Sequence, residues 1–168
     1  MLKSFYGKFP KIPKSCYVSE SVDIIGDVTF GENVNVWFGT VIRGDMNYIK
    51  VDDNSNIQDN SVIHVTTNVS PTIIGKGVTV GHNAIVHGAK INDFCLIGMG
   101  SIIMDEVIIG EGSIIAAGCV IPQKMIIPPR SLVIGLPAKI KRKTTNEEYM
   151  MIIERSNHYI DFAKKYKG

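Results

Sequence analysis

The sequence has 168 residues, of which 20% are charged, and its formal net charge is +2. This length gives one compact domain with a core, and the small net charge excludes a surface built to bind nucleic acid. No stretch approaches the roughly 18 consecutive apolar residues of a membrane span, and residues 1–14 lack the apolar run of a signal peptide. We therefore expect a cytoplasmic protein without membrane contact, in which the three cysteines are reduced thiols.

The first segment, residues 1–17, contains Pro10 and Pro13 and shows no regular apolar pattern. We expect an extended arm that covers the open backbone edge of the structure that follows.

Residues 18–126 carry an apolar residue at nearly every sixth position, a period that neither an α-helix nor a simple strand has. The clearest run is Ile91, Ile97, Ile103, Ile109, Ile115 and Ile121. This period predicts a parallel β-helix, in which each repeat is one short strand and one corner. Three sides close a coil of about 18 residues, and successive coils stack about 4.8 Å apart.

The corners are predicted at the third residue after each inward position, where residues that tolerate a left-handed backbone occur. They are Asp27, Asn33, Gly39, Asn54, Asn60, Gly77, Asn83, Gly100, Gly112 and Gly118. The fourth residue after each inward position is small or apolar, and this column includes Cys95 and Cys119. We interpret both cysteines as packing residues.

The repeat is interrupted at residues 43–50, at residues 65–73 and between Val86 and Ile91. Prolines after residue 126 predict a connecting segment over residues 127–144. Residues 145–168 have the pattern of an amphipathic helix that lies against the β-helix, with Thr145 and Glu148 spaced as a capping box.

Three of the four histidines lie beside these interruptions. His64 and His87 each directly follow an inward residue, so we place them one coil apart, about 4.8 Å, where two imidazoles can share a metal ion. His82 points from a different side and is out of reach in its own chain. A second copy can supply it, and we therefore predict a homotrimer with metal sites shared by two subunits.

Three imidazoles with an open fourth position are typical of a catalytic zinc site, because structural zinc usually has four protein ligands. Zinc lowers the pKa of a bound water to about 7 and so provides hydroxide at neutral pH. Iron and cobalt also accept three imidazoles. The fourth histidine, His158, belongs to the predicted helix, and we interpret it as a surface residue.

Polar residues surround the predicted metal site. Gln58 directly follows an inward residue, as His64 does, and its amide can orient a hydroxide. Arg43 and Asp45 protrude from the interruption at residues 43–50, and we predict an ion pair between subunits.

The motifs together resemble the gamma-class carbonic anhydrases and their bacterial homologues over nearly the whole chain. They are Val36-Trp37, Val41-Ile42-Arg43-Gly44-Asp45, Asn56-Ile57-Gln58-Asp59, Val62-Ile63-His64-Val65, Gly81-His82, Val86-His87-Gly88, Ile97-Gly98-Met99-Gly100 and Gly135-Leu136-Pro137-Ala138. The resemblance implies an all-β, left-handed parallel β-helix, a trimer, and zinc-dependent conversion of carbon dioxide to bicarbonate.

The same resemblance implies roles for single residues. It implies that His64 and His87 of one chain bind zinc together with His82 of the next chain. It also implies that Arg43 and Asp45 pair across the interface. The residues that would line the catalytic site are Asn56, Gln58, Asp59 and Tyr159.

The sequence departs from the family archetype at two places. Met46 stands where the archetype has a glutamate, and residues 66–71 replace an acidic loop that carries a proton-transfer glutamate. Two other functions stay open: a hexapeptide-repeat acyltransferase or thioesterase that acts on coenzyme A esters, and a catalytically inactive metal-binding trimer.

Overall fold

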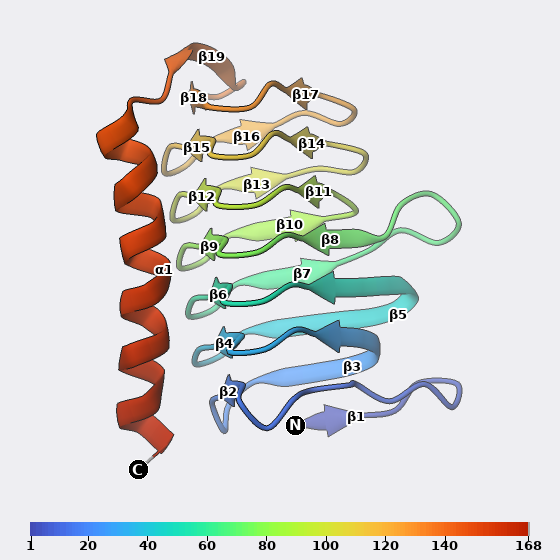
Figure 1. Ribbon diagram of the computed structural model, residues 1–168. Coiled ribbons are helices and arrows are strands. Elements are labelled where there is room, and N and C mark those ends of the chain that lie inside the picture. The colour runs from blue at the N-terminus through green and yellow to red at the C-terminus, as the bar shows by residue number, and fades with distance from the viewer. Residues whose placement is uncertain (168) are drawn as a thin grey trace.

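The computed structural model describes residues 1–167, and it is a three-sided stack of short strands with one helix along its side (Figure 1). The last residue of the predicted helix segment, Gly168, lies outside the described residues. The elements are β1 (Leu2–Lys3), β2 (Tyr17–Val18), β3 (Asp23–Phe30), β4 (Asn35–Val36), β5 (Val41–Val51), β6 (Asn56–Ile57), β7 (Val62–His64), β8 (Thr72–Ile74), β9 (Thr79–Val80), β10 (Ile85–His87), β11 (Lys90–Ile91), β12 (Leu96–Ile97), β13 (Ile102–Ile103), β14 (Ile108–Ile109), β15 (Ile114–Ile115), β16 (Val120–Ile121), β17 (Ile126–Ile127), β18 (Ser131–Ile134), β19 (Lys139–Lys143) and α1 (Asn146–Lys167).

The inward column of the repeat forms the core. Ile97, Ile103 and Ile115 are completely buried, as are the other isoleucines of the six-residue period. Cys95 and Cys119 are buried beside them, and burial raises the pKa of the Cys95 thiol to about 12. The predicted parallel β-helix is thereby confirmed, and the cysteines serve as packing residues.

The corners follow the sequence prediction closely. Nine of the ten predicted residues have a positive φ, and the exception is Asp27, because the preceding Gly26 takes that conformation with φ 80°. Phe94 and Glu106 also have a positive φ, at 52° and 60°. The position in the repeat therefore determines the corner even where the residue is neither Gly nor Asn.

The three sides of the stack differ in what covers them. The first side, β2-β4-β6-β9-β12-β15-β18, carries α1, which contacts β2, β4, β6 and β9. The second side consists of β7, β10, β13 and β16 with the first residues of β3 and β5, and we call it the open face. The third side consists of β8, β11, β14 and β17 with the end of β5.

Two segments are more regular than the sequence predicted. Residues 43–50 belong to the continuous strand β5, which turns the corner from the open face to the third side by pairing with β7 and then with β8. The stack also continues past residue 126, because β17 pairs with β14 and β18 pairs with β15. Within the predicted connecting segment, β19 then pairs antiparallel with β18.

The two ends of the chain lie along the stack. In the N-terminal arm, β1 pairs in parallel with β3, and Lys11 bridges to Thr29. At the start of α1, Glu148 accepts a hydrogen bond from the Thr145 backbone N–H (2.8 Å), and Thr145 Oγ1 accepts one from the Glu148 N–H (3.2 Å), so the capping box forms. In residues 1–167 the structure holds no helix with the length and apolar character needed to cross a bilayer.

Candidate metal centre

His64 and His87 lie directly above one another in the stack. Strands β7 and β10 pair in parallel with His64 opposite His87, because both residues directly follow an inward residue. His64 Nδ1 lies 3.0 Å from His87 Nε2. The structure thus confirms that these two rings lie one coil apart and close enough to share an ion.

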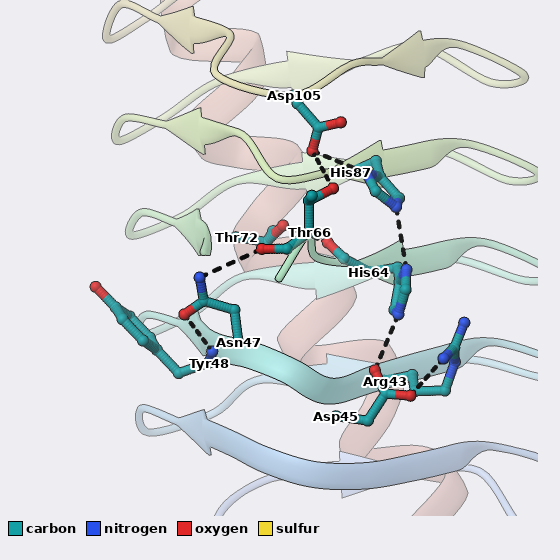
Figure 2. A network of polar contacts seen from close by, with 9 residues as sticks. All are labelled: Arg43, Asp45, Asn47, Tyr48, His64, Thr66, Thr72, His87 and Asp105. Carbon is teal, nitrogen blue, oxygen red and sulfur yellow. Dashed lines mark hydrogen bonds and ion pairs between the residues drawn. The ribbon is translucent and has the colours of Figure 1, made fainter. Parts of the chain in front are cut away.

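A carboxylate contacts the outer nitrogen of each ring (Figure 2). Asp45 Oδ1 lies 3.0 Å from His64 Nε2, and Asp105 Oδ1 lies 2.9 Å from His87 Nδ1. Since a carboxylate only accepts hydrogen bonds, each outer nitrogen carries the proton. Asp45, His64, His87 and Asp105 therefore form one continuous column along a corner of the stack.

This arrangement leaves two lone pairs facing each other. With both outer nitrogens protonated, the neutral rings direct His64 Nδ1 and His87 Nε2 at each other across 3.0 Å. Two such lone pairs repel unless a proton or a cation lies between them. Burial lowers the pKa of His64 and the charge of Arg43 adds to this effect, although Asp45 opposes it. The two facing ring nitrogens are a donor set that fits a metal cation.

Arg43 and Asp45 form their ion pair within one chain. Side chains two residues apart in strand β5 point to the same side, which allows this contact. The expected pairing of these residues between subunits stays a prediction. Burial alone would raise the pKa of Asp45, but hydrogen bonds from Arg43 and His64 outweigh this effect and lower it. Asp45 therefore remains an anion that orients His64.

His82 lies at a different corner, in the segment between β9 and β10. Its Nδ1 is 2.7 Å from Asp59 Oδ2, which comes from the coil below. Asp59 thus contacts His82, and the Nε2 atom of His82 stays available for another partner. Both side chains are partly exposed, at 39% for His82 and 32% for Asp59.

The other predicted site residues gather around His82. Gln58, His82 and Tyr159 line one hollow of about 240 Å³ between α1 and the corner. Gln58 Nε2 donates to Asn56 Oδ1 (3.1 Å), and Asn56 Nδ2 donates to Thr79 Oγ1 (2.8 Å), so both buried amides have fixed orientations. Burial raises the pKa of Tyr159 and the Asp59 charge adds to this, so its phenol keeps its proton.

The predicted site is therefore split into two halves on one chain. One half holds His64 and His87 with Asp45, and the other half holds His82 with the hollow. Within residues 1–167, no group of three His, Cys, Asp or Glu side chains is placed to hold a metal ion. His158, outside both halves, is exposed and stacks on Phe162.

The sequence prediction missed Asp105 and Arg155. Asp105 follows His87 by 18 residues, and the nominal coil length of 18 is the signal that could have found it, although the coil from Val86 to Ile103 has 17 residues. Arg155 lies four residues before Tyr159 on α1 and lines the same hollow. No periodic signal marks Arg155, because the helix docks on the stack through tertiary contacts.

Comparisons with known proteins find relatives that match nearly the whole chain. The family model for the bacterial transferase hexapeptide (six repeats) matches residues 88–123. The chain is 42% identical to "Carbonic anhydrase" of Geobacillus kaustophilus, with 100% of this chain and 92% of the relative covered. It is 40% identical to "Gamma carbonic anhydrase 2, mitochondrial" of Arabidopsis thaliana over 97% of this chain, and it spans 60% of that relative's length.

Among solved structures, the fold matches a hexapeptide transferase family protein from Anaplasma phagocytophilum. The TM-score is 0.94 at 38% identity, and the match covers 98% of this chain and 97% of that one. The paired imidazoles, their aspartates and the near full-length identity to the relative from Geobacillus kaustophilus lead to one conclusion. The chain belongs to the gamma-class carbonic anhydrase family.

Proposed function

We propose that this protein is a trimeric, cytoplasmic metalloenzyme that converts carbon dioxide to bicarbonate and back. The observation that carries the proposal is the pair of inner nitrogens, His64 Nδ1 and His87 Nε2, which face each other across 3.0 Å between two carboxylates. His82 of a neighbouring copy is the proposed third ligand, and zinc is the proposed metal, with iron or cobalt as alternatives.

The open face supports a trimer. Its outward residues form a continuous apolar column, because the strands pair in register: Val41, Val62, Ile85, Ile102 and Val120. Val62, Ile85 and Ile102 are 39%, 37% and 38% exposed in the single chain. A continuous apolar surface of this kind is typical of an interaction site.

The position of this column fits a shared site. The corner with His82 lies at one edge of the open face, and the corner with His64 and His87 lies at the other edge. Rotation about a threefold axis brings the first edge of one copy to the second edge of the next. Burial of the apolar column would therefore assemble both halves of the site at the same time.

A divalent metal ion supplies a hydroxide nucleophile from water at neutral pH. The residues of the chain position the reactants around it. Asn56 holds the Gln58 amide, so that Gln58 can direct a hydrogen bond at the nucleophile or at a substrate oxygen. Tyr159 keeps its proton and can donate a hydrogen bond to the developing bicarbonate.

The proton released when water is converted to hydroxide needs an acceptor, and among residues 1–167 no free carboxylate lies beside the His64–His87 pair to take it. Asp45 and Asp105, the two carboxylates that contact the His64–His87 pair, are both occupied by imidazole N–H groups. Met46 is 54% exposed next to Asp45 and has no ionisable group. We therefore propose that buffer molecules from solution accept the proton.

The test combines metal analysis with stopped-flow hydration of carbon dioxide. The purified protein should be a trimer with about one metal per chain, and His82→Ala should lose both metal and activity without loss of the folded state. A metal-free monomer would contradict the whole proposal. A metal-loaded trimer without activity would leave only the metal-binding trimer.

One observation favours a second function. The hollow beside His82, at about 240 Å³, is larger than carbon dioxide requires, and Leu96 and Met99 add apolar lining beside Arg155. The match to the hexapeptide transferase family protein from Anaplasma phagocytophilum is consistent with acyl transfer or hydrolysis of a coenzyme A ester. Release of free coenzyme A from acetyl-coenzyme A, lost in Arg155→Ala but retained in the metal-free protein, would establish this alternative.

A further inference from the structure

Four corner aspartates, Asp53, Asp59, Asp93 and Asp105, occupy the same place in the repeat, the second residue after an inward one, but they do not play the same role. Asp59 Oδ2 lies 2.7 Å from His82 Nδ1, at the other corner of the open face. Asp53 Oδ1 accepts a hydrogen bond from the Glu32 backbone N–H (2.8 Å), and Asp93 Oδ1 accepts one from the Lys76 N–H (2.9 Å). The Asp53 and Asp93 carboxylates therefore both accept hydrogen bonds from the backbone of the coil below. Asp105 Oδ1 instead contacts two side chains, His87 Nδ1 and Thr66 Oγ1, each at 2.9 Å.

A glycine lies against the Asp105 carboxylate, as Gly31 lies against Asp53 and Gly75 against Asp93. Gly88, next to His87, has φ 54°, and a Cβ atom there would collide with Asp105 Oδ1 and Ser70 Oγ. Only glycine lets the carboxylate reach the imidazole while keeping this corner conformation. The glycine is therefore common to these corners, and the contacts with His87 and Thr66 are what distinguish Asp105.

Asp105 also holds the segment that interrupts the repeat between β7 and β8, which projects from the stack in Figure 1. Thr66 donates a hydrogen bond to Asp105 (Figure 2). Thr66 also forms an isolated antiparallel β-bridge with Ser70. Ser70 Oγ in turn donates to the Gly88 carbonyl oxygen (2.6 Å). One carboxylate oxygen therefore connects His87 to residues 66–70.

We propose that Asp105 is a positioning residue that fixes His87 for metal binding and couples residues 66–70 to that ligand. The carboxylate keeps the proton on His87 Nδ1, so the Nε2 lone pair points toward His64. Carboxylates that orient metal-binding histidines in this way typically contribute 10-fold to 100-fold in metal affinity. The inference rests on the proposed role of His87 as a ligand.

The experiment compares Asp105→Ala and Asp105→Asn with Asp93→Asn, a control from the same repeat position that does not contact a histidine. Zinc affinity is measured by competition with a chelator. We expect a loss of about 10-fold to 100-fold for Asp105→Ala, a smaller loss for Asp105→Asn, whose amide oxygen still accepts from Nδ1, and no change for Asp93→Asn. Unchanged affinity in Asp105→Ala, with loss in His64→Ala, would overturn the inference and leave the proposed function intact.

Two measurements on the metal-free trimer separate the inference from the proposed function. Nitrogen chemical shifts of the His87 ring should show the Nδ1–H tautomer in the parent protein, a mixture of tautomers in Asp105→Ala, and a smaller share of the other tautomer in Asp105→Asn. Hydrogen exchange at residues 66–70 should become faster in both variants and stay unchanged in Asp93→Asn. Identical spectra and exchange in all proteins would overturn the role of Asp105, whether or not the parent protein binds zinc.

Discussion

His82 and His87 lie at opposite ends of one side of the stack, with β10 between them, so their rings face different corners. An extended segment of five residues spans up to about 16 Å, which is several times the length of a metal–nitrogen bond. Strand β10 separates the two rings. Its residue Ile85 faces the exterior, between the two halves of the site. A neighbouring copy can therefore complete the site, whereas movement within one chain cannot.

The first prediction uses this separation. His82→Ala and His87→Ala should each be inactive alone, but trimers reassembled from an equal mixture should recover about a quarter of the sites, because each site takes one half from each of two subunits. A mixture of His64→Ala and His87→Ala is the matched control and should recover none, since both changes affect the same half. Stopped-flow hydration checks both mixtures, and equal recovery in the two would contradict a shared site.

The second prediction concerns the open face. Ile102→Asp should convert the trimer into a folded monomer that no longer retains metal, because a charge would be buried at the centre of the apolar column. Ile108→Asp is the control, since Ile108 is 39% exposed, like Ile102 at 38%, but lies on the third side in β14. Light scattering coupled to gel filtration gives the mass. A trimeric Ile102→Asp protein would show that the subunits associate elsewhere.

The third prediction concerns the proton. Because the two aspartates beside the imidazole pair are engaged by ring N–H groups, kcat should rise several-fold with imidazole buffer concentration while kcat/KM for carbon dioxide changes little. Met46→Glu should raise kcat at low buffer by placing a carboxylate next to Asp45. A kcat that does not depend on buffer would indicate an internal proton acceptor that we have not identified.

The fourth prediction concerns pH and the start of α1. Arg142 forms two hydrogen bonds with Glu148 (2.8 and 2.7 Å), and together with the Thr145 N–H it lowers the pKa of Glu148 from 4.5 to about 2. A lowered carboxyl pKa stabilises the folded state above pH 4.5, and this contribution is lost as the pH falls toward 2. Glu148→Gln should therefore lower Tm by about 2–4 °C at pH 7.

Thermal unfolding at several pH values checks this expectation. The difference in Tm between Glu148→Gln and the parent protein should shrink steadily below pH 4.5. Glu154→Gln, in the middle of α1, is the control and should behave like the parent protein at every pH. If the difference in Tm between Glu148→Gln and the parent protein did not change with pH, the charge of the Glu148 carboxylate would not contribute to the stability of the folded state.

The sequence predicted those features that the repeat controls locally. The isoleucine period predicted the core, and the placement of His64 and His87 in adjacent coils followed from their equal positions after inward residues. The corner at Gly26 was missed, because it depends on how β3 and β5 bend while they pair. Asp105 was missed because its role arises only when the next coil is stacked on His87.

Helix α1 starts beside the last coil, where Arg130 donates to the Thr145 carbonyl oxygen, and ends beside the first coil, where Lys167 donates to the Lys14 and Ser15 carbonyl oxygens. In a solenoid without such a helix, each repeat contacts only its neighbours, and the terminal repeats can unfold first. Here α1 contacts both the first and the last coil. Local unfolding of either end coil therefore breaks contacts with the helix that also stabilises the other end. Unfolding should therefore follow a single cooperative transition, and cutting the chain between β19 and α1 should replace it with stepwise loss of coils.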